Sequence, residues 1–323
     1  MFKNFLSVKD VSNMDLLIQQ AMMYKENRHT RATLGAGKKI GLLFFNPSMR
    51  TRLSTQIAAS NLGMESIVYN IDKEGWKMEF VESAVMNGDA VEHIKDAAPV
   101  LGQYFDILGI RTFPGLTDRE ADYQETLLHY FRKYTGIPII SMESATVHPL
   151  QSLADILTIE EQLIHNPLTK KPKVVLTWAP HIKPLPQCVA NSFSQWVNAW
   201  GKSDFVITHP PGFELEKGFT EGAHITVNQK EALEDADFVY VKNWSSYENY
   251  GSMATGDMSE WMLTLDKLKA TNNAKVMHCL PVRRNVELSD EVLDSNHSLV
   301  TQQAGNRVWS AQAVLSSMLE NIL

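Results

Sequence analysis

Short apolar segments alternate with helical patterns along most of the 323 residues. In the first half, apolar runs at residues 40–45, 107–110 and 138–141 are separated by segments with helical periodicity. The second half repeats the pattern from Val174 onwards. This alternation predicts an α/β fold with parallel sheets flanked by helices. The chain is long enough for two such domains, each with its own core.

Composition narrows the possible functions. A hydrophobic content of 44% and a charged content of 21% are typical of a soluble globular protein. The net charge of −7 argues against nucleic acid as the main partner. Only Cys188 and Cys279 occur, far apart, so neither a disulfide framework nor a cysteine-based metal site is expected. No apolar run approaches membrane-spanning length, and we expect a cytoplasmic location.

A candidate anion site follows the first predicted strand. A helical pattern starts by Leu53 and ends at Gly63, which places residues 48–51 where a helix begins. Backbone N–H groups and the positive end of the helix dipole make such a position suitable for an anion. Ser48 and Thr51 add hydroxyl groups, and Arg50 adds a guanidinium that matches phosphate oxygens. The alternative is an ordinary helix cap beside a solvated arginine.

Unusual residues stand at the ends of several predicted strands. Arg111 and Glu143 follow the strands at 107–110 and 138–141 in the first half. In the second half, strand ends carry Trp178-Ala179-Pro180-His181, Lys242-Asn243-Trp244 and His278-Cys279-Leu280-Pro281. Parallel α/β sheets bind ligands at the carboxyl ends of their strands, although Arg111 could also be a surface residue. No glycine-rich dinucleotide fingerprint follows these strands, which weakens a dehydrogenase interpretation.

Three of these segments resemble the signatures of one family. Residues 48–52 are similar to the Ser-Thr-Arg-Thr-Arg phosphate loop of the aspartate/ornithine carbamoyltransferases, with Met49 in place of the first threonine. His148-Pro149-Leu150-Gln151 matches the second signature, and His278-Cys279-Leu280-Pro281 matches the third in its ornithine-branch form. The resemblance covers the whole chain. It implies two doubly wound parallel-sheet domains joined by interdomain helices, and carbamoyl transfer from carbamoyl phosphate to an amine without a metal or organic cofactor.

The resemblance also implies how the chain is organised. Residues 1–147 would bind carbamoyl phosphate, with a C-terminal helix at 307–323 packing back on them, and residues 148–306 would bind the acceptor. The family forms homotrimers with shared active sites, in which the loop carrying Trp76 would reach the neighbouring subunit. Trp76 as a core or interface anchor is the alternative. The expected ligands of carbamoyl phosphate are Ser48, Met49, Arg50, Thr51, Trp76, Arg111, His148, Gln151, Cys279, Leu280 and Arg307.

Four of these residues, Arg50, Arg111, His148 and Cys279, are expected to act in catalysis. The arginines and His148 would stabilise the developing oxyanion and the departing phosphate, and such preorganised donors usually supply the largest catalytic contribution. An alkyl ammonium must lose a proton before it attacks. The sequence leaves open whether a side chain or the leaving phosphate accepts that proton.

The acceptor site differs from that of the ornithine branch. Lys242 stands where ornithine carbamoyltransferases carry the aspartate that pairs with the α-ammonium, so free ornithine should be repelled. An acylated α-nitrogen carries no charge, and the chain resembles the N-acylornithine carbamoyltransferases in its Trp-Ala-Pro-His and Lys-Asn-Trp segments. The acylornithine ligands implied by this resemblance are Glu143, His181, Lys242, Arg283 and Val91.

Val91 is the residue expected to select the acyl group. Acetyl-specific relatives are expected to carry a glutamate near this point, which would repel the carboxylate of a succinyl group. Valine therefore favours N2-succinyl-L-ornithine, giving N-succinyl-L-citrulline in arginine biosynthesis, with N2-acetyl-L-ornithine as the alternative. Glu92 is the next residue, so a register error of one position would reverse this prediction. Val91 could instead pack on the helix behind it.

Two broader alternatives are a carbamoyltransferase for another amine and a non-catalytic paralogue that keeps the fold as a binding subunit. An acceptor panel would separate the first from the main hypothesis. The second is disfavoured because the expected set of Arg50, Arg111, His148, Gln151 and Cys279 is intact.

Overall fold

The computed structural model describes residues 2–322, which form two compact units. Unit 1 comprises Met1–Gly115, Glu120–Leu150 and Arg307–Leu323, and unit 2 comprises Leu116–Arg119 and Gln151–Asn306. The outermost residues of the predicted domains, Met1 and Leu323, lie outside the described part of the chain. No helix between residues 2 and 322 is long and apolar enough to cross a membrane.

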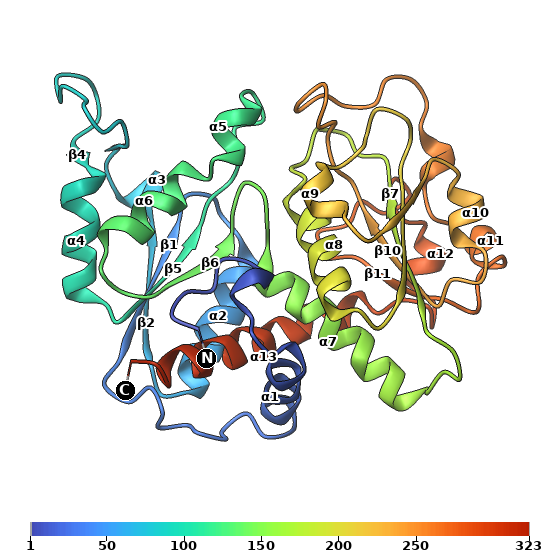
Figure 1. Cartoon of the computed structure of the whole chain (residues 1–323), viewed down its shortest axis with the longest axis horizontal. Helices are drawn as coiled ribbons and strands as arrows, with labels where there is room; N and C mark the ends of the chain where they lie inside the picture. The colour runs from blue at the N-terminus through green and yellow to red at the C-terminus, as the bar shows by residue number, and fades with distance from the viewer. Residues whose placement is uncertain (1, 323) are drawn as a thin grey trace. The chain divides into compact units, whose positions relative to one another are not determined.

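Unit 1 is built on a four-stranded parallel sheet (Figure 1). Its strand order is β2-β1-β5-β6. The strands are β1 (Lys39–Phe44), β2 (Glu65–Asn70), β5 (Ile107–Arg111) and β6 (Ile139–Glu143). β1, β5 and β6 are buried almost throughout, as expected for parallel strands covered on both faces.

Helices cover both faces of this sheet. On one face, α4 (Ile94–Tyr104) and α6 (Thr126–Tyr134) share a hydrophobic core with β5. Elsewhere in unit 1, the Tyr24 hydroxyl donates to Ser316 Oγ at 2.7 Å, which ties α1 (Met14–Glu26) to the C-terminal helix α13 (Val300–Leu319). The other elements of this half are η1 (Val8–Asp10), α1 (Met14–Glu26), α2 (Met49–Asn61), α3 (Ile71–Glu74), β3 (Met78–Glu79), β4 (Glu92–His93) and α5 (Arg119–Tyr123).

Unit 2 contains a five-stranded parallel sheet in the order β11-β10-β7-β8-β9. Figure 1 shows α8 on one side of this sheet and α10, α11 and α12 on the other. The strands are β7 (Lys173–Trp178), β8 (Asp204–Thr208), β9 (His224–Thr226), β10 (Phe238–Lys242) and β11 (Lys275–Met277). The helices are α8 (Cys188–Trp200), α9 (Lys217–Thr220), α10 (Gln229–Leu233), η2 (Ser259–Trp261), α11 (Leu265–Leu268) and α12 (Asp290–Leu293). The long helices α7 (Pro149–His165) and α13 (Val300–Leu319) each contribute residues to both units.

Both sheets are doubly wound, so the predicted α/β fold is confirmed. The order of connection reverses between β1 and β5 in unit 1, and between β7 and β10 in unit 2. Ligands of doubly wound folds bind beyond the carboxyl ends of the strands at such a reversal. The fold therefore directs attention to the segments that follow β1, β5, β7 and β10.

Two predicted boundaries differ from the structure. The predicted domain boundary follows residue 147, whereas unit 1 extends to Leu150, whose carbonyl accepts a hydrogen bond from Ser310 of the same unit. The predicted C-terminal helix at 307–323 was wrong in its limits, since α13 runs Val300–Leu319. It begins earlier because helical hydrogen bonding already starts with the Gln303 N–H, which donates to the Leu299 carbonyl at 2.8 Å.

Candidate active site

The predicted helix start after β1 is present. Ser48 is the N-cap of α2, with extended backbone, and its Oγ accepts a hydrogen bond from the Thr51 N–H at 3.3 Å. The helix begins at Met49, before the apolar pattern at Leu53. The Met49 side chain is exposed, so it contributes little to the core of the unit. The first turn of α2 thus presents its backbone N–H groups as the sequence suggested.

Thr51 is the centre of a buried group that we call the anion cluster, made of Thr51, Arg111, Glu143, His148 and Arg307. Its hydroxyl oxygen accepts hydrogen bonds from Arg111 Nη1 at 3.4 Å and from Arg307 Nη2 at 2.6 Å. Arg111 also forms an ion pair with Glu143. All five residues are buried. They come from α2, β5, β6, α13 and the residue before α7, so the fold assembles them from distant parts of the sequence.

His148 is neutral in this environment. Its pKa lies well below the ordinary value of 6.5 because of burial, and the charges of Arg307 and Arg111 lower it further. The distance of 3.5 Å from its Nε2 to the Glu143 carboxylate is therefore not an ion pair between charged groups. His148 Nδ1 is buried and has no hydrogen-bond partner among residues 2–322. A neutral imidazole with an unsatisfied nitrogen is suited to contact a ligand oxygen.

The charge of this region favours a dianion. Arg50 precedes Thr51 in the first turn of α2, and its Nε is buried without a hydrogen-bond partner in the described part of the chain. Arg111 and Arg307 add two further guanidinium groups at Thr51, and the Glu143 carboxylate pairs with Arg111. These cations, together with backbone N–H groups at a helix start, match a phosphate group.

Trp76 and Val91 belong to a separate small ribbon of unit 1, in which β3 pairs with β4. Trp76 Nε1 donates to the Glu92 carboxylate at 2.8 Å, and the Val91 N–H donates to the Lys77 carbonyl at 2.9 Å. The side chains of Trp76 and Val91 are 53% and 66% exposed. Trp76 is therefore not a core residue of its own chain. The exposure of Val91 argues against the alternative that it packs on the following helix α4.

His181 and Arg283 are brought together in unit 2. Arg283 Nε donates to His181 Nε2 at 3.1 Å, and His181 Nδ1 lies 2.8 Å from the Lys183 carbonyl. The Lys183 N–H also lies 3.2 Å from Nδ1, so the contacts of Nδ1 do not assign its role, but the bond from Arg283 requires a lone pair on Nε2 and therefore a neutral imidazole. Burial lowers the pKa of His181 below 6.5, in agreement with this assignment, although the Lys183 carbonyl and the Glu287 charge oppose the shift. His181 thus holds the Arg283 guanidinium.

Lys242, Gln151, Cys279 and Leu280 are also placed in unit 2. Lys242 is the last residue of β10 and is buried. Gln151 lies in the first turn of α7, and its amide nitrogen donates to Asp155 Oδ1 at 2.7 Å. Burial raises the pKa of the Cys279 thiol, so Cys279 is suited to a contact role rather than to nucleophilic attack. Leu280 has a left-handed backbone, with φ of 56°.

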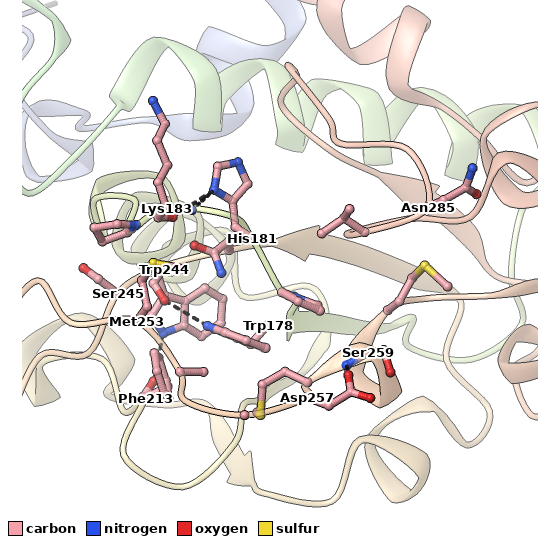
Figure 2. Close-up of a pocket in the computed structure, with 18 residues that line it drawn as sticks. Trp178, His181, Lys183, Phe213, Trp244, Ser245, Met253, Asp257, Ser259 and Asn285 are labelled. Carbon is pink, nitrogen blue, oxygen red and sulfur yellow. Dashed lines mark hydrogen bonds between the residues drawn. The ribbon is translucent and has the colours of Figure 1, made fainter.

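A cavity of about 350 Å³ in unit 2 is walled by the two tryptophan-bearing motifs (Figure 2). The Trp178 indole donates to the Trp244 carbonyl at 2.9 Å, and the Trp244 indole donates to the Phe213 carbonyl at 2.8 Å. These bonds fix the aromatic wall. His181 and Lys183 line the same cavity. An apolar wall with a few polar groups is typical of a site for a small organic ligand.

Sequence reasoning missed two buried carboxylates that contact predicted site residues. Asp155 is bonded to Gln151, and Glu287 accepts a hydrogen bond from the Arg283 N–H at 2.8 Å. The available signal was the spacing of four residues between Gln151 and Asp155, which places both on one face of a helix. Glu287 carried no comparable signal, because its burial depends on tertiary packing.

The fold and the anion cluster define a carbamoyltransferase. A family model for the carbamoyl phosphate-binding domain of aspartate/ornithine carbamoyltransferase matches residues 3–161, and the model for its Asp/Orn-binding domain matches residues 187–318. The chain therefore belongs to the aspartate/ornithine carbamoyltransferase family, as its signatures indicated.

Individual relatives refine this assignment. An N-succinylornithine carbamoyltransferase of Bacteroides thetaiotaomicron is 47% identical, with 99% of each chain covered. An N-acetylornithine carbamoyltransferase of Xylella fastidiosa is 35% identical, with 98% of each covered. A solved glutamate-to-valine variant of N-acetyl-L-ornithine transcarbamylase, in complex with carbamyl phosphate and N-succinyl-L-norvaline, is 34% identical. It has a TM-score of 0.89 over 98% of this chain and 99% of its own.

Proposed function

We propose that this protein transfers the carbamoyl group of carbamoyl phosphate to the side-chain amine of N2-succinyl-L-ornithine, giving N-succinyl-L-citrulline and phosphate in arginine biosynthesis. The observation that carries the proposal is the buried anion cluster, in which Arg111 and Arg307 converge on the Thr51 hydroxyl beside neutral His148. The similarity to N-succinylornithine carbamoyltransferases supports the choice of acceptor.

In this proposal, the phosphate group binds at the start of α2, where Ser48, Met49, Arg50 and Thr51 supply N–H groups, hydroxyls and a guanidinium. Arg111, Arg307 and His148 stabilise the negative charge that develops on the carbamoyl oxygen and on the departing phosphate. Donors held in place before reaction contribute most when water is excluded, and burial of this cluster meets that condition. Gln151, Cys279 and Leu280 complete the contacts to the carbamoyl group.

The acceptor is proposed to bind through the cations of unit 2. Lys242 and Arg283 suit the carboxylates of an acylated amino acid, and the hydrogen bond from Arg283 to His181 orients its guanidinium. Glu143 was predicted to contact the acylornithine. Its ion pair with Arg111 gives it a second proposed role, since it fixes the direction of that guanidinium.

Val91 supports succinyl over acetyl as the acyl group. Its side chain is exposed and uncharged, and Glu92 is already bonded to the Trp76 indole. In a relative at 34% identity, a variant with valine in place of a glutamate was solved with N-succinyl-L-norvaline. We take Val91 as the position facing the acyl chain, with N2-acetyl-L-ornithine as the alternative acceptor.

A homotrimer with shared active sites is part of the proposal. On α2, Met49, Leu53 and Ile57 expose apolar side chains at intervals of four residues, 67%, 51% and 45% exposed. This spacing gives one apolar helix face that a second copy of the chain could cover. Trp76 is then free to reach a neighbouring subunit, as the family resemblance implied. The cytoplasmic location stays a prediction.

The test is colorimetric detection of a ureido product after incubation with carbamoyl phosphate and an acceptor. N2-succinyl-L-ornithine should give the highest kcat/KM, N2-acetyl-L-ornithine a lower one, and free ornithine almost none. A preference for the acetyl compound would move the assignment to the alternative. No ureido product from any of the three would refute the proposed reaction.

A further inference from the structure

His278 is buried completely in unit 2 and is bonded on both sides of its ring. The Leu280 N–H donates to His278 Nδ1 at 2.9 Å, so Nδ1 must carry a lone pair. The proton of the neutral ring is therefore on Nε2, which lies 3.2 Å from Glu287 Oε1 and donates to it. This arrangement supports Leu280, whose left-handed backbone is unusual for a leucine and needs fixed surroundings.

Glu287 uses both carboxylate oxygens. Oε1 accepts from His278, and Oε2 accepts from the Arg283 N–H at 2.8 Å. Burial by itself would raise the pKa of the Glu287 carboxyl, but the His278 hydrogen bond, the nearby Lys242 charge and the backbone N–H of Arg283 lower it below its ordinary value. One ionised, buried carboxylate thus fixes the turn at Leu280 and the backbone of Arg283.

The bonding continues from the other side of His278 towards Gln151. The backbone N–H of His278 donates to Gln303 Oε1 at 2.9 Å, which leaves the Gln303 amide nitrogen to donate to Asp155 Oδ1 at 2.7 Å. Gln151 donates to the same Asp155 oxygen, also at 2.7 Å. Gln151, Asp155, Gln303, His278 and Glu287 are all completely buried. The backbone N–H of His278 can only donate, so it fixes the orientation of the Gln303 amide, and the main chain of His278 joins this side to the bonds of the ring.

We propose that Asp155, Gln303, His278 and Glu287 form a positioning relay that holds Gln151 and Arg283 in register with each other. The inference rests on the proposed function, in which Gln151 contacts the carbamoyl nitrogen and Arg283 contacts the acceptor. The relay acts through these two residues and through the turn at Leu280.

The relay determines which end of the Gln151 amide faces the substrate. A carbamoyl NH₂ group is a hydrogen-bond donor, so Gln151 must present its oxygen to it. Asp155 accepts from the amide nitrogen of Gln151 and so turns the amide oxygen the other way. An amide without this partner could rotate and present a second donor to the substrate. Asp155 thereby selects the productive orientation, and Gln303 holds Asp155.

The two adjacent glutamines of α13 give a matched test. Gln303→Met removes the two hydrogen bonds of the Gln303 side chain, one from the backbone N–H of His278 and one to Asp155. Gln302→Met makes the same change one residue earlier, where Gln302 bonds to Glu161 and Gln162 instead. Gln303→Met should lower kcat/KM for both carbamoyl phosphate and the acylornithine by about 10- to 100-fold, the range expected when a supporting partner is lost. Gln302→Met should stay within about twofold of wild type. Equal effects of the two substitutions would overturn the relay.

A double-mutant cycle tests whether the relay acts as one unit. Glu287→Gln offers one acceptor oxygen where two are needed, so either the His278 Nε2–H or the Arg283 N–H loses its partner. In the wild-type background this change should lower kcat/KM for the acceptor at least tenfold and also raise KM for carbamoyl phosphate. In the Gln303→Met background its effect on carbamoyl phosphate should disappear. Fold losses that simply multiply would show that the two ends are independent.

A measurement on the unaltered protein separates failure of the relay from failure of the proposed function. With ¹⁵N-labelled histidine, the His278 ring should give the signals of the neutral Nε2–H tautomer at pH 7.5, assigned by their loss in His278→Asn. A charged ring or the Nδ1–H tautomer would refute the relay, whatever the effect of the other substitutions on activity. An enzyme with the expected tautomer but no ureido product would refute the function alone.

Discussion

Val91→Glu is expected to change the acyl preference of the enzyme. The Val91 N–H is fixed by the Lys77 carbonyl, and its side chain is 66% exposed, so a glutamate can be accommodated without disturbing the core. The new carboxylate would face the terminal carboxylate of the succinyl group. At about 6 Å and an effective dielectric constant of about 40 to 80, two like charges repel by about 0.7–1.4 kcal/mol. That energy corresponds to a decrease of about 3- to 10-fold in kcat/KM for N2-succinyl-L-ornithine.

The assay is steady-state ureido formation with the succinyl and acetyl acceptors at saturating carbamoyl phosphate. N2-acetyl-L-ornithine lacks the terminal carboxylate, so its kcat/KM should be little changed by Val91→Glu. Val91→Gln is the matched control, since it adds nearly the same volume without a charge and should leave the ratio unaltered. Increased salt should weaken the effect of Val91→Glu, because the position is exposed.

Two results would refute this reasoning. A ratio that changes equally in Val91→Glu and Val91→Gln would show that size, rather than charge, determines the preference. A ratio that is unaffected by Val91→Glu but altered by Glu92→Gln would show that Glu92 faces the acyl group. The hydrogen bond from Trp76 already holds the Glu92 carboxylate, which argues that Val91 rather than Glu92 faces the acyl group.

Three further predictions concern the anion cluster and the assembly. Arg50→Ala should lower kcat about 10²- to 10³-fold, as for the loss of one preorganised donor, with an unchanged melting temperature; near-normal turnover would contradict the phosphate site. The pKa of buried His148 is lowered, so His148 takes up a proton near pH 6.5 in the unfolded chain but not in the native protein. The free energy of unfolding should therefore be highest above pH 6.5 and decrease as the pH falls. Urea unfolding at pH 7.5 and 5.5 should show this loss, at most about 1.4 kcal/mol per pH unit, and a slope unchanged in His148→Gln would contradict it. Mixed Trp76→Ala and Arg50→Ala subunits should recover activity that neither has alone; a monomer in light scattering, or no recovery after proven subunit exchange, would contradict shared sites.

The sequence by itself determined the main strands and their alternation with helices. Short continuous apolar runs are typical of buried parallel strands, and β1, β5 and β7 occur where runs of four to six residues predicted them. The helix start at α2 was also readable, because a helix cap depends on neighbouring residues, as in the bond from the Thr51 N–H to Ser48. These features are local, and a local pattern specifies them.

Tertiary structure alone decided which side chains meet. Thr51 and Arg307 are 256 positions apart and share a hydrogen bond of 2.6 Å. Gln303 and Asp155 are 148 positions apart and share a hydrogen bond, although the sequence alone suggested no role for either residue. The physical reason is that residue periodicity states only which face of an element is buried. The partners on that face depend on strand order and on where the long helices α7 and α13 place their polar groups, and both follow from packing of the whole chain.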